Sequence, residues 1–297
     1  MSTEHPPHNL HIPVLLESTL QLLDPQAGES YLDLTAGYGG HAGEILAKTG
    51  NYKESVLVDR DDYAIAHLSS YEDQGTRLLH TDFVSAAQQL NEEGKKFDII
   101  LVDLGVSSPQ LDQGERGFSF KNDGPLDMRM DRRQELSAAT LVNTAKADEL
   151  VRIIRDYGEE PMNVARRIAD AIVANRPFET TGQLAELIRH AYRGYRGRIH
   201  PATRTFQALR IAVNQELQQV EDVLPLLPKL LNKGGRVGVI SFHSLEDRLV
   251  KRYFAQQTAA GFEAELQVLT KKPLDGATYD VHNPRSRSAK LRVAVKI

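Results

Sequence analysis

The sequence contains neither cysteine nor tryptophan among its 297 residues. A chain without cysteine cannot form a disulfide, a thiolate-ligated zinc site or a cysteine-held iron–sulfur cluster. It also cannot attack a substrate with a thiolate. The absence therefore excludes disulfide-rich scaffolds and enzyme mechanisms that begin with a covalent cysteine adduct.

Long apolar runs and a secretion leader are missing as well. No apolar run approaches 18 residues, so we expect no segment that spans a bilayer. Residues 1–10 are polar and include two prolines, unlike the basic and then apolar pattern of a signal peptide. The hydrophobic share of 41% and the charged share of 26% are typical of globular proteins. We therefore expect a cytoplasmic protein without contact to membranes.

The excess of one charge sign is small. The chain carries 36 basic and 40 acidic residues, so its net charge of -4 gives no sign of a nucleic-acid partner. The total conceals two stretches without any acidic residue, 187–215 and 281–297. Such stretches either form a solvated surface or bind phosphate, which relieves the repulsion between their bases. Their bases are Arg189, Arg193, Arg196, Arg198, Arg204 and Arg210, then Arg285, Arg287, Lys290, Arg292 and Lys296.

The first hundred residues alternate between two kinds of pattern. Short apolar runs that end near glycine or aspartate predict buried strands, and longer amphipathic runs between them predict helices. This alternation is typical of βαβ units and a parallel sheet. The predicted strands cover 30–35, 55–59, 76–80 and 97–103, and the predicted helices cover 41–48, 61–69 and 84–91.

The alternation stops after residue 103 and resumes near residue 235. Residues 105–130 predict a long loop, and residues 137–231 have helical periodicity, with one long helix over 204–224. We therefore predict an α/β fold, a Rossmann-like domain with an inserted, mainly helical domain. The first domain would comprise 1–108 and 232–297, and the insert 109–231. Its later elements are predicted as strands over 235–241, 263–270 and 290–296 and a helix over 245–254.

A glycine-rich motif follows the first predicted strand. Its spacing Gly37-x-Gly39-x-x-Ala42 lets the backbone turn tightly and approach a ligand at a helix N-terminus. Asp59 ends the next strand, where an acid would bind ribose hydroxyls. The alternative is an ordinary strand-to-helix turn in which Asp59 caps the following helix. The motif favours an adenosine-containing ligand and leaves a dinucleotide and S-adenosylmethionine open.

A second motif follows the fourth predicted strand, from Asp103 to Gln110. In open parallel sheets, ligands lie beyond the carboxyl ends of the strands, so this loop is expected beside the glycine loop. Ser107-Ser108-Pro109-Gln110 resembles the Ser-Pro variant of a motif of amino-methyltransferases, without its aromatic residue. Taken alone, a Ser-Pro loop after a strand is also a common turn.

Longer blocks of sequence make the resemblance specific. The chain resembles the bacterial small-subunit ribosomal RNA cytidine N(4)-methyltransferases, the RsmH (MraW) family. The resemblance covers nearly the whole chain, but the segment 254–283 is shorter than in some members, so no substrate role is assigned to it. The matching blocks are 11–16, 37–41, 103–110, 115–120, 124–130, 157–160, 200–207, 241–248 and 283–288.

This resemblance implies S-adenosylmethionine-dependent methylation of the exocyclic amine of a decoding-centre cytidine in 16S rRNA, within the small ribosomal subunit. The missing cysteine agrees with it, because an amine can take the methyl group directly, without a covalent enzyme–base intermediate. Asp59 would bind the ribose and Phe83 would pack on the adenine. The implied cofactor residues are Gly37, Gly39, Gly40, His41, Asp59, Phe83, Asp103 and Gln110.

The resemblance also directs attention to groups that could orient the amine and contact RNA. An acceptor for the amine hydrogens would turn the nitrogen lone pair toward the methyl group and help remove a proton. Candidates for this catalytic role are Asp103, Ser107, Ser108 and the backbone before Pro109. The candidate RNA contacts are Arg116, Arg129, His200, Arg204, His243 and Arg285.

Several alternatives remain at this point. His243, Glu246 and Asp247 imitate a metal cluster, but their spacing fits a helix start better, so we expect no metal. A nicotinamide-dependent oxidoreductase could use the same glycine loop, and a non-catalytic RNA-binding module for ribosome assembly could use the basic stretches. The sequence leaves monomer and homodimer open.

Overall fold

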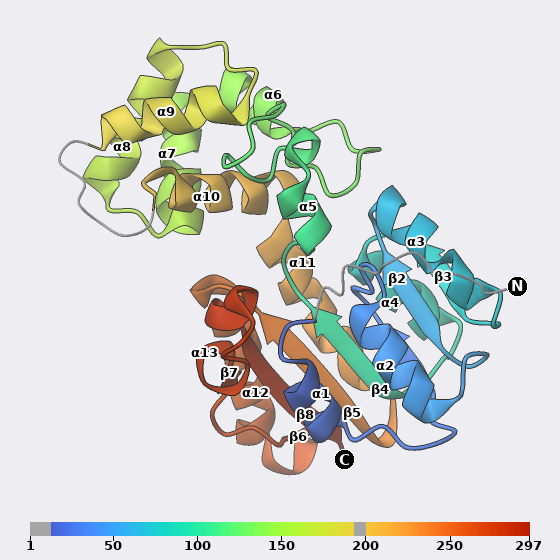
Figure 1. Cartoon of the computed structure of the whole chain (residues 1–297). Helices are drawn as coiled ribbons and strands as arrows, with labels where there is room; N and C mark the ends of the chain where they lie inside the picture. The colour runs from blue at the N-terminus through green and yellow to red at the C-terminus, as the bar shows by residue number, and fades with distance from the viewer. Residues whose placement is uncertain (1–12, 193–199) are drawn as a thin grey trace, which may run out of the picture. The chain divides into compact units, whose positions relative to one another are not determined.

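The computed structural model describes residues 13–192 and 200–297. The chain divides into two compact units (Figure 1). Residues 1–105 and 219–297 form the first, here called the sheet unit, and residues 106–218 form the second, here called the helical unit. Within the described residues, no helix is both long enough and apolar enough to cross a membrane.

The sheet unit is built on one eight-stranded sheet, with strands in the order β3-β2-β1-β4-β5-β8-β6 and β7 paired to β8. The first five strands run parallel, while β8 is antiparallel to β5, β6 and β7. The predicted α/β class is therefore confirmed, and the strands predicted over 97–103 and 290–296 have the expected bounds. The strands are β1 Tyr31–Asp33, β2 Val56–Asp59, β3 Arg77–His80, β4 Phe97–Asp103, β5 Leu231–Ser241, β6 Leu266–Val268, β7 Leu274–Asp275 and β8 Lys290–Lys296.

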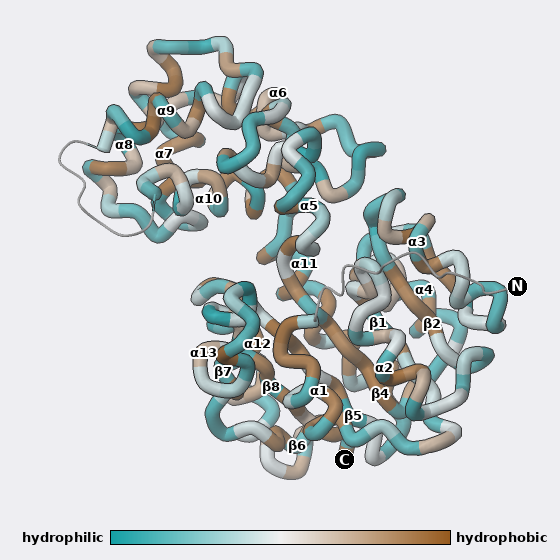
Figure 2. Tube along the Cα trace, viewed as in Figure 1, coloured by the Kyte–Doolittle hydropathy of each residue, from teal (hydrophilic) through white to brown (hydrophobic). Residues whose placement is uncertain are grey.

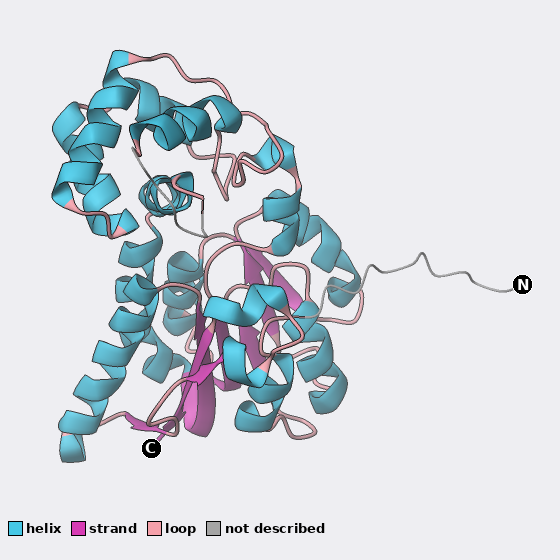
Figure 3. Cartoon of the chain, turned by 60° about the vertical axis from the view of Figure 1, so that its left-hand side comes forward, coloured by secondary structure: helices cyan, strands magenta, loops and turns pink. Residues whose placement is uncertain are grey.

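Helices cover both faces of this sheet (Figure 3). Successive strand residues point to opposite faces, so Ile100 and Val102 join one apolar core, and Ile99 and Leu101 join the other. Burial on both faces explains the continuous hydrophobic character of β4 (Figure 2). The helices are α1 Leu16–Leu23, α2 Gly40–Thr49, α3 Asp62–Glu72, α4 Phe83–Glu92, η2 Leu224–Leu230, α12 Ser244–Ala259, η3 Gly261–Glu263, α13 Gly276–Tyr279 and η4 Pro284–Ser288.

The second boundary of the insert lies earlier than residue 231, where it was predicted. Residues 219–231 belong to the sheet unit, because their apolar side chains pack on the same core as β4 and β5. Helical periodicity does not reveal which core a helix joins. The buried residues concerned are Val220, Val223, Leu224, Leu227, Leu230 and Leu231.

The helical unit has one apolar core of its own. The predicted loop 105–130 contains two short helices, because Ser107 and Gln110 form a capping box that starts the first of them. The unit contains α5 Ser108–Asp112, η1 Gly114–Arg116, α6 Ala138–Thr144, α7 Ala147–Gly158, α8 Met162–Ala174, α9 Thr181–Ala191 and α10 Ala202–Asn214.

The single long helix predicted over 204–224 is wrong. Gln215 adopts a left-handed conformation with φ 52° and separates α10 from α11 Glu216–Val223. Just before it, the Asn214 side chain accepts a hydrogen bond from the Met130 N–H (2.9 Å) and donates one to the Met128 carbonyl (2.8 Å). These bonds tie the end of α10 to the segment that precedes α6, an interaction that periodicity cannot reveal.

Candidate active site

The glycine loop lies between β1 and α2 in the sheet unit. Gly37 and Gly39 have φ values of 54° and 80°, which side chains with a Cβ rarely adopt. A Cβ on Gly39 would lie 2.9 Å from the Tyr71 ring, and one on Gly40 would lie 2.6 Å from the Pro13 ring. No side chain of residues 13–192 or 200–297 caps the start of α2, so these residues leave its first N–H groups available to a ligand. The loop thus has the geometry of an anion- or nucleotide-binding turn.

Asp59 holds this loop from the end of β2. Its carboxylate accepts hydrogen bonds from the Gly37 N–H (2.8 Å) and from the Asp61 N–H (2.9 Å). Burial raises the pKa of Asp59, and these two bonds oppose the rise. The cap of α3 is Asp61, which accepts from the Tyr63 N–H, so the alternative role of Asp59 as a helix cap is wrong. The carboxylate has lone pairs left for further donors.

Phe83 begins α4 immediately after its capping residue. Asp82 accepts hydrogen bonds from the Val84 and Ser85 N–H groups (both 3.0 Å), and this cap fixes the start of the helix. The Phe83 side chain belongs to the apolar core and is 8% exposed. Its position after β3 puts it at the carboxyl edge of the sheet, the same edge as the glycine loop.

Four titratable side chains gather near β1 and the end of β4. The His41 Nε2 lies 3.7 Å from the Asp103 Oδ2, and the Asp33 Oδ2 accepts a 2.6 Å hydrogen bond from the Tyr31 hydroxyl. Burial lowers the pKa of His41 to about 4 and raises the pKa of Asp33 to about 6. The histidine is therefore neutral at pH 7.

Of the two acids in this group, Asp103 is the one with a carboxylate oxygen that accepts no hydrogen bond from the described residues. Its N–H donates to the Thr35 hydroxyl (2.6 Å), which fixes the backbone, while its buried Oδ1 has no partner among the described residues. Burial raises the pKa of Asp103 well above its ordinary value, and the carboxylates of Asp33 and Glu246 add to the rise. An acceptor with these properties suits the transient binding of a donor or a proton.

The residues that follow Asp103 open the helical unit. Ser107 caps α5 by accepting from the Gln110 N–H (3.5 Å), and the Gln110 side-chain oxygen accepts from the Ser107 N–H (3.0 Å). Ser108 and Gln110 are buried, and Pro109 lies in the first turn, where its missing N–H has no cost. Gln110, expected in the cofactor pocket, thus uses its amide oxygen to cap its own helix.

Two arginines expected to contact RNA form hydrogen bonds within the helical unit. Arg116 is 1% exposed and donates to the Arg129 carbonyl (3.2 Å). Arg129 forms a two-bond ion pair with Asp127 (both 2.8 Å) and donates to the Gln134 carbonyl (2.8 Å). Both guanidinium groups thus bind backbone carbonyls of residues 129–134, and the RNA contact expected of Arg116 and Arg129 stays a prediction.

Two arginines of the acid-free stretch 187–215 form ion pairs with acidic residues that lie just outside it in the helical unit. Arg189 pairs with Glu186 (2.6 Å), and Arg210 pairs with Glu216 through two 2.9 Å bonds. Arg204 remains largely exposed, at 59% of its side chain. Arg193, Arg196 and Arg198 lie outside the described residues.

His200 and the sheet-unit candidates have defined local roles. His200 is exposed, stacks on Phe120 at 4.7 Å between ring centres, and accepts from the Ala202 N–H (3.2 Å). His243 caps α12, and its Nε2 lies 3.3 Å from Glu246. Arg285 is exposed on η4. Three other bases of the last stretch are paired, Lys290 and Arg292 with Asp247 and Lys296 with Glu265, and Arg287 is exposed.

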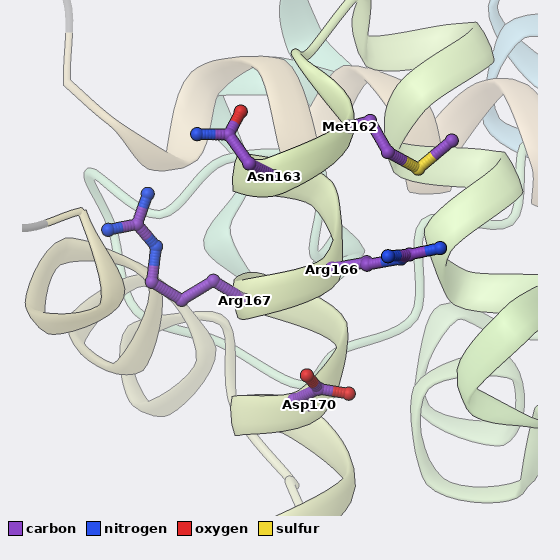
Figure 4. A pocket seen from close by; sticks show the side chains of 5 residues that line it. All are labelled: Met162, Asn163, Arg166, Arg167 and Asp170. Atoms are coloured by element: carbon purple, nitrogen blue, oxygen red, sulfur yellow. The ribbon is translucent and has the colours of Figure 1, made fainter.

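Five residues of α8 line a hollow of about 640 Å³, and none of them was predicted from the sequence to bind a ligand. Figure 4 shows Arg166 and Arg167 on opposite sides of this helix, with Asp170 one turn further on. Two adjacent arginines, Arg166 and Arg167, are the only hint of this hollow in the sequence. They lie close to Asp170 and so belong to neither stretch without acidic residues. The lining residues are Met162, Asn163, Arg166, Arg167 and Asp170.

A glycine loop and acidic side chains at the carboxyl edge of a mainly parallel sheet are typical of α/β enzymes that bind an adenosine-containing cofactor. Residues 8–297 match the model of the MraW methylase family. The Ribosomal RNA small subunit methyltransferase H of Cyanothece sp. is 50% identical, over 99% of this chain and 97% of that protein. The protein of the same name from Synechocystis sp. is 48% identical, over 97% of this chain and 93% of that protein.

Among solved structures, TrmN from Thermus thermophilus is similar with a TM-score of 0.44 and 12% identity. That similarity covers 95% of this chain and 48% of the TrmN chain, so this chain spans about half its length.

The chain belongs to the MraW methylase family. The resemblance stated from the sequence is thereby confirmed, and with it the class of enzyme and the cofactor, an S-adenosylmethionine-dependent methyltransferase. Of the two cofactors that the glycine loop left open, the dinucleotide is excluded by this membership.

Proposed function

We propose that the protein methylates the exocyclic N(4) amine of a decoding-centre cytidine in 16S rRNA. The observation that carries the proposal is the Asp103 carboxyl, whose buried Oδ1 has no partner among the described residues and lies at the same sheet edge as the glycine loop. An exocyclic amine is a donor that such an oxygen accepts. Two relatives of this chain are named for the methylation of small-subunit ribosomal RNA.

The residues of the sheet unit fit S-adenosylmethionine. The loop Gly37–Gly40 and the uncapped start of α2 would receive its methionine end, beside His41. Asp59 would accept hydrogen bonds from the ribose hydroxyls, and Phe83 would pack on the adenine. Asp103 would complete the sheet-unit part of the pocket, and Gln110, in the helical unit, remains a predicted cofactor contact.

The chemistry is a direct transfer of a methyl group to nitrogen. The cofactor, when bound, supplies an electrophilic methyl carbon, so a nitrogen–carbon bond forms as the sulfur–carbon bond breaks, and the nitrogen loses a proton. The Asp103 carboxylate accepts an amine hydrogen, which turns the nitrogen lone pair toward the methyl carbon. Its raised pKa lets it take up the proton that leaves. The Ser107 and Ser108 hydroxyls and the backbone before Pro109 would hold the second amine hydrogen.

We assign RNA recognition mainly to the helical unit. Arg204 and His200 are exposed there, and His243 and Arg285 would add contacts from the sheet unit. The target base must leave its stack to reach the methyl group, as in other base-modifying enzymes. An enzyme with this substrate would act in the cytoplasm, on RNA within the small ribosomal subunit.

Two measurements test this function. Isothermal titration should show binding of S-adenosylhomocysteine and none of NADH, whereas the opposite would favour an oxidoreductase. Purified small subunits and naked 16S rRNA, both lacking the modification, should then be incubated with the protein and methyl donor. Mass mapping should locate one added methyl group on a cytidine amine of the small subunit. RNA binding without methyl transfer would favour a non-catalytic assembly module.

A further inference from the structure

Glu160 is a buried carboxylate, and one of its two oxygens has no hydrogen-bond partner among the described residues. Its side chain is fully buried, and its Oε2 accepts a 2.5 Å hydrogen bond from the Tyr192 hydroxyl. A guanidinium nitrogen of Arg204 lies 3.9 Å from the same oxygen. The other oxygen, Oε1, is buried without a partner in the part of the chain that the structure describes. Burying a carboxylate with so few partners costs free energy, because its desolvation is only partly offset.

The local backbone aims this carboxylate at the start of α10. Helix α7 ends at Gly158, Glu159 turns the chain with φ 50°, and Pro161 precedes α8. A Cβ on Gly158 would lie 3.0 Å from the Arg204 carbonyl oxygen, so only glycine allows the turn to approach α10 this closely. The Gln207 side chain also donates to the Tyr157 carbonyl (3.1 Å). The turn is thus fixed against the helix that carries Arg204.

The contact between Glu160 and Arg204 differs from the structural ion pair on the same helix. Arg210 is 16% exposed and shares two hydrogen bonds of 2.9 Å with the buried Glu216, so one edge of its guanidinium is held by a single carboxylate. The Arg204 guanidinium lies 3.9 Å from the Glu160 carboxylate, beyond hydrogen-bond distance, and 59% of its side chain is exposed. A guanidinium has five N–H donors in a planar fork, so it can face a carboxylate on one edge and a phosphate on another.

We propose that Glu160 is a positioning residue that holds Arg204 in place to bind an RNA backbone phosphate. This inference rests on the proposed RNA substrate and adds the device that orders one contact to it. An unrestrained arginine loses much side-chain freedom when it binds, and the buried carboxylate removes part of that freedom beforehand. Tyr192 keeps the carboxylate itself in one orientation.

The test is the substitution Glu160→Gln, which keeps the shape and can still accept from Tyr192 but removes the charge. RNA affinity is measured by fluorescence anisotropy with a 16S rRNA fragment over a range of salt concentrations. We expect the affinity to fall about three- to tenfold and the salt slope to decrease by about one. Binding of S-adenosylhomocysteine should not change. Equal or tighter RNA binding would overturn the proposal, because a carboxylate that only repelled phosphate would give that result.

A double-mutant cycle separates positioning from a general structural effect. Arg204→Ala alone should lower affinity, and Glu160→Gln added to it should cause no further loss, whereas additive losses would contradict a shared role. Arg204→Lys keeps the charge but not the fork, so it should recover only part of the affinity. The matched control is Glu186→Gln, which removes the exposed partner of Arg189 in the same unit and should leave RNA affinity unreduced.

Failure of the underlying function gives a different result. If the wild-type protein does not bind the RNA fragment, both the proposed substrate and the proposed role of Glu160 are wrong. If the unchanged protein binds and Glu160→Gln binds equally well, only the positioning role is wrong. Thermal melting of each variant shows that it is folded.

Discussion

At the scale of single residues, sequence spacing predicts backbone requirements better than side-chain partners. The sequence placed Gly37 and Asp59 at the ends of neighbouring strands, and the structure adds a hydrogen bond from the Gly37 N–H to the Asp59 carboxylate that was not predicted. Arg116 and Arg129 could not be placed in this way. Whether an arginine faces solvent or a set of carbonyls depends on a turn that forms only in the folded chain.

Substitution of Asp59 tests the cofactor site. Asp59→Ala removes an acceptor for the ribose and the bond that holds Gly37, so we expect the dissociation constant of S-adenosylhomocysteine to rise about tenfold or more. Isothermal titration measures this change. The control is Asp61→Ala, which removes the α3 cap and should lower stability by about 1 kcal/mol while it leaves the affinity nearly unchanged. An unchanged affinity in Asp59→Ala would refute the ribose assignment.

Asp33 and His41 should impose opposite pH dependences on stability. The pKa of Asp33 is raised from 3.8 to about 6, so its contribution is present below pH 3.8 and is lost as the pH rises through about 6. The pKa of His41 is lowered from 6.5 to about 4, so its contribution is present above pH 6.5 and is lost as the pH falls through about 4. In the unchanged protein, the two effects largely cancel between pH 4 and 6.

Single variants should expose each effect. Urea unfolding between pH 4 and 6 should show stability rising more steeply with pH in Asp33→Asn than in the unchanged protein. In His41→Gln the stability should fall as the pH rises. Each slope should differ from that of the unchanged protein by up to about 1.4 kcal/mol per pH unit. Identical slopes in all three proteins would show that neither pKa is shifted by burial.

At the scale of helices and strands, continuous burial is what the sequence reveals most clearly. β4 and β8 were predicted with their observed bounds, because a short apolar run with polar residues at both ends defines where a strand begins and ends. α1 was not predicted, since it lies between two left-handed residues, Leu15 and Asp24, rather than between recognisable caps. The break at Gln215 was missed for a related reason, as glutamine gives no sign of a positive φ.

Gln215 offers a test of that break. A left-handed residue with a Cβ is strained, so Gln215→Gly should stabilise the protein by about 0.5–1 kcal/mol. The same change at the exposed helical residue Gln256 should destabilise it by about 1 kcal/mol, because that position is right-handed. Urea denaturation of both variants measures the difference. A loss of stability in Gln215→Gly would mean that its side chain contributes more than the strain costs.

At the scale of the whole molecule, charge is distributed unevenly between chain segments. Residues 1–105 contain 17 acidic and 6 basic residues, while residues 106–218 contain 15 acidic and 17 basic residues. A polyanion is therefore repelled by the segment that carries the glycine loop, which supports the assignment of RNA contacts to the helical unit and the C-terminal segment. The overall charge of -4 hid this difference.

The helical unit should fold when separated from the rest. It has its own apolar core, so a fragment of residues 106–218 should be helical by circular dichroism and should melt cooperatively. It should bind RNA weakly and S-adenosylhomocysteine not at all, because the glycine loop is absent from it. A fragment that melts without a cooperative transition would show that its core depends on the sheet unit.

The insertion of one unit within the other has a consequence for how the chain folds. β4 and β5 are neighbours in the sheet, yet residues 104–230 separate them in the chain. Closing a disordered loop of that length is entropically unfavourable and slow, and it would leave the edge of β4 unpaired during synthesis. Contacts within the helical unit are more local, so it can become compact first and shorten the effective loop. The order of folding thus follows from topology: the insert first, and the second half of the sheet last.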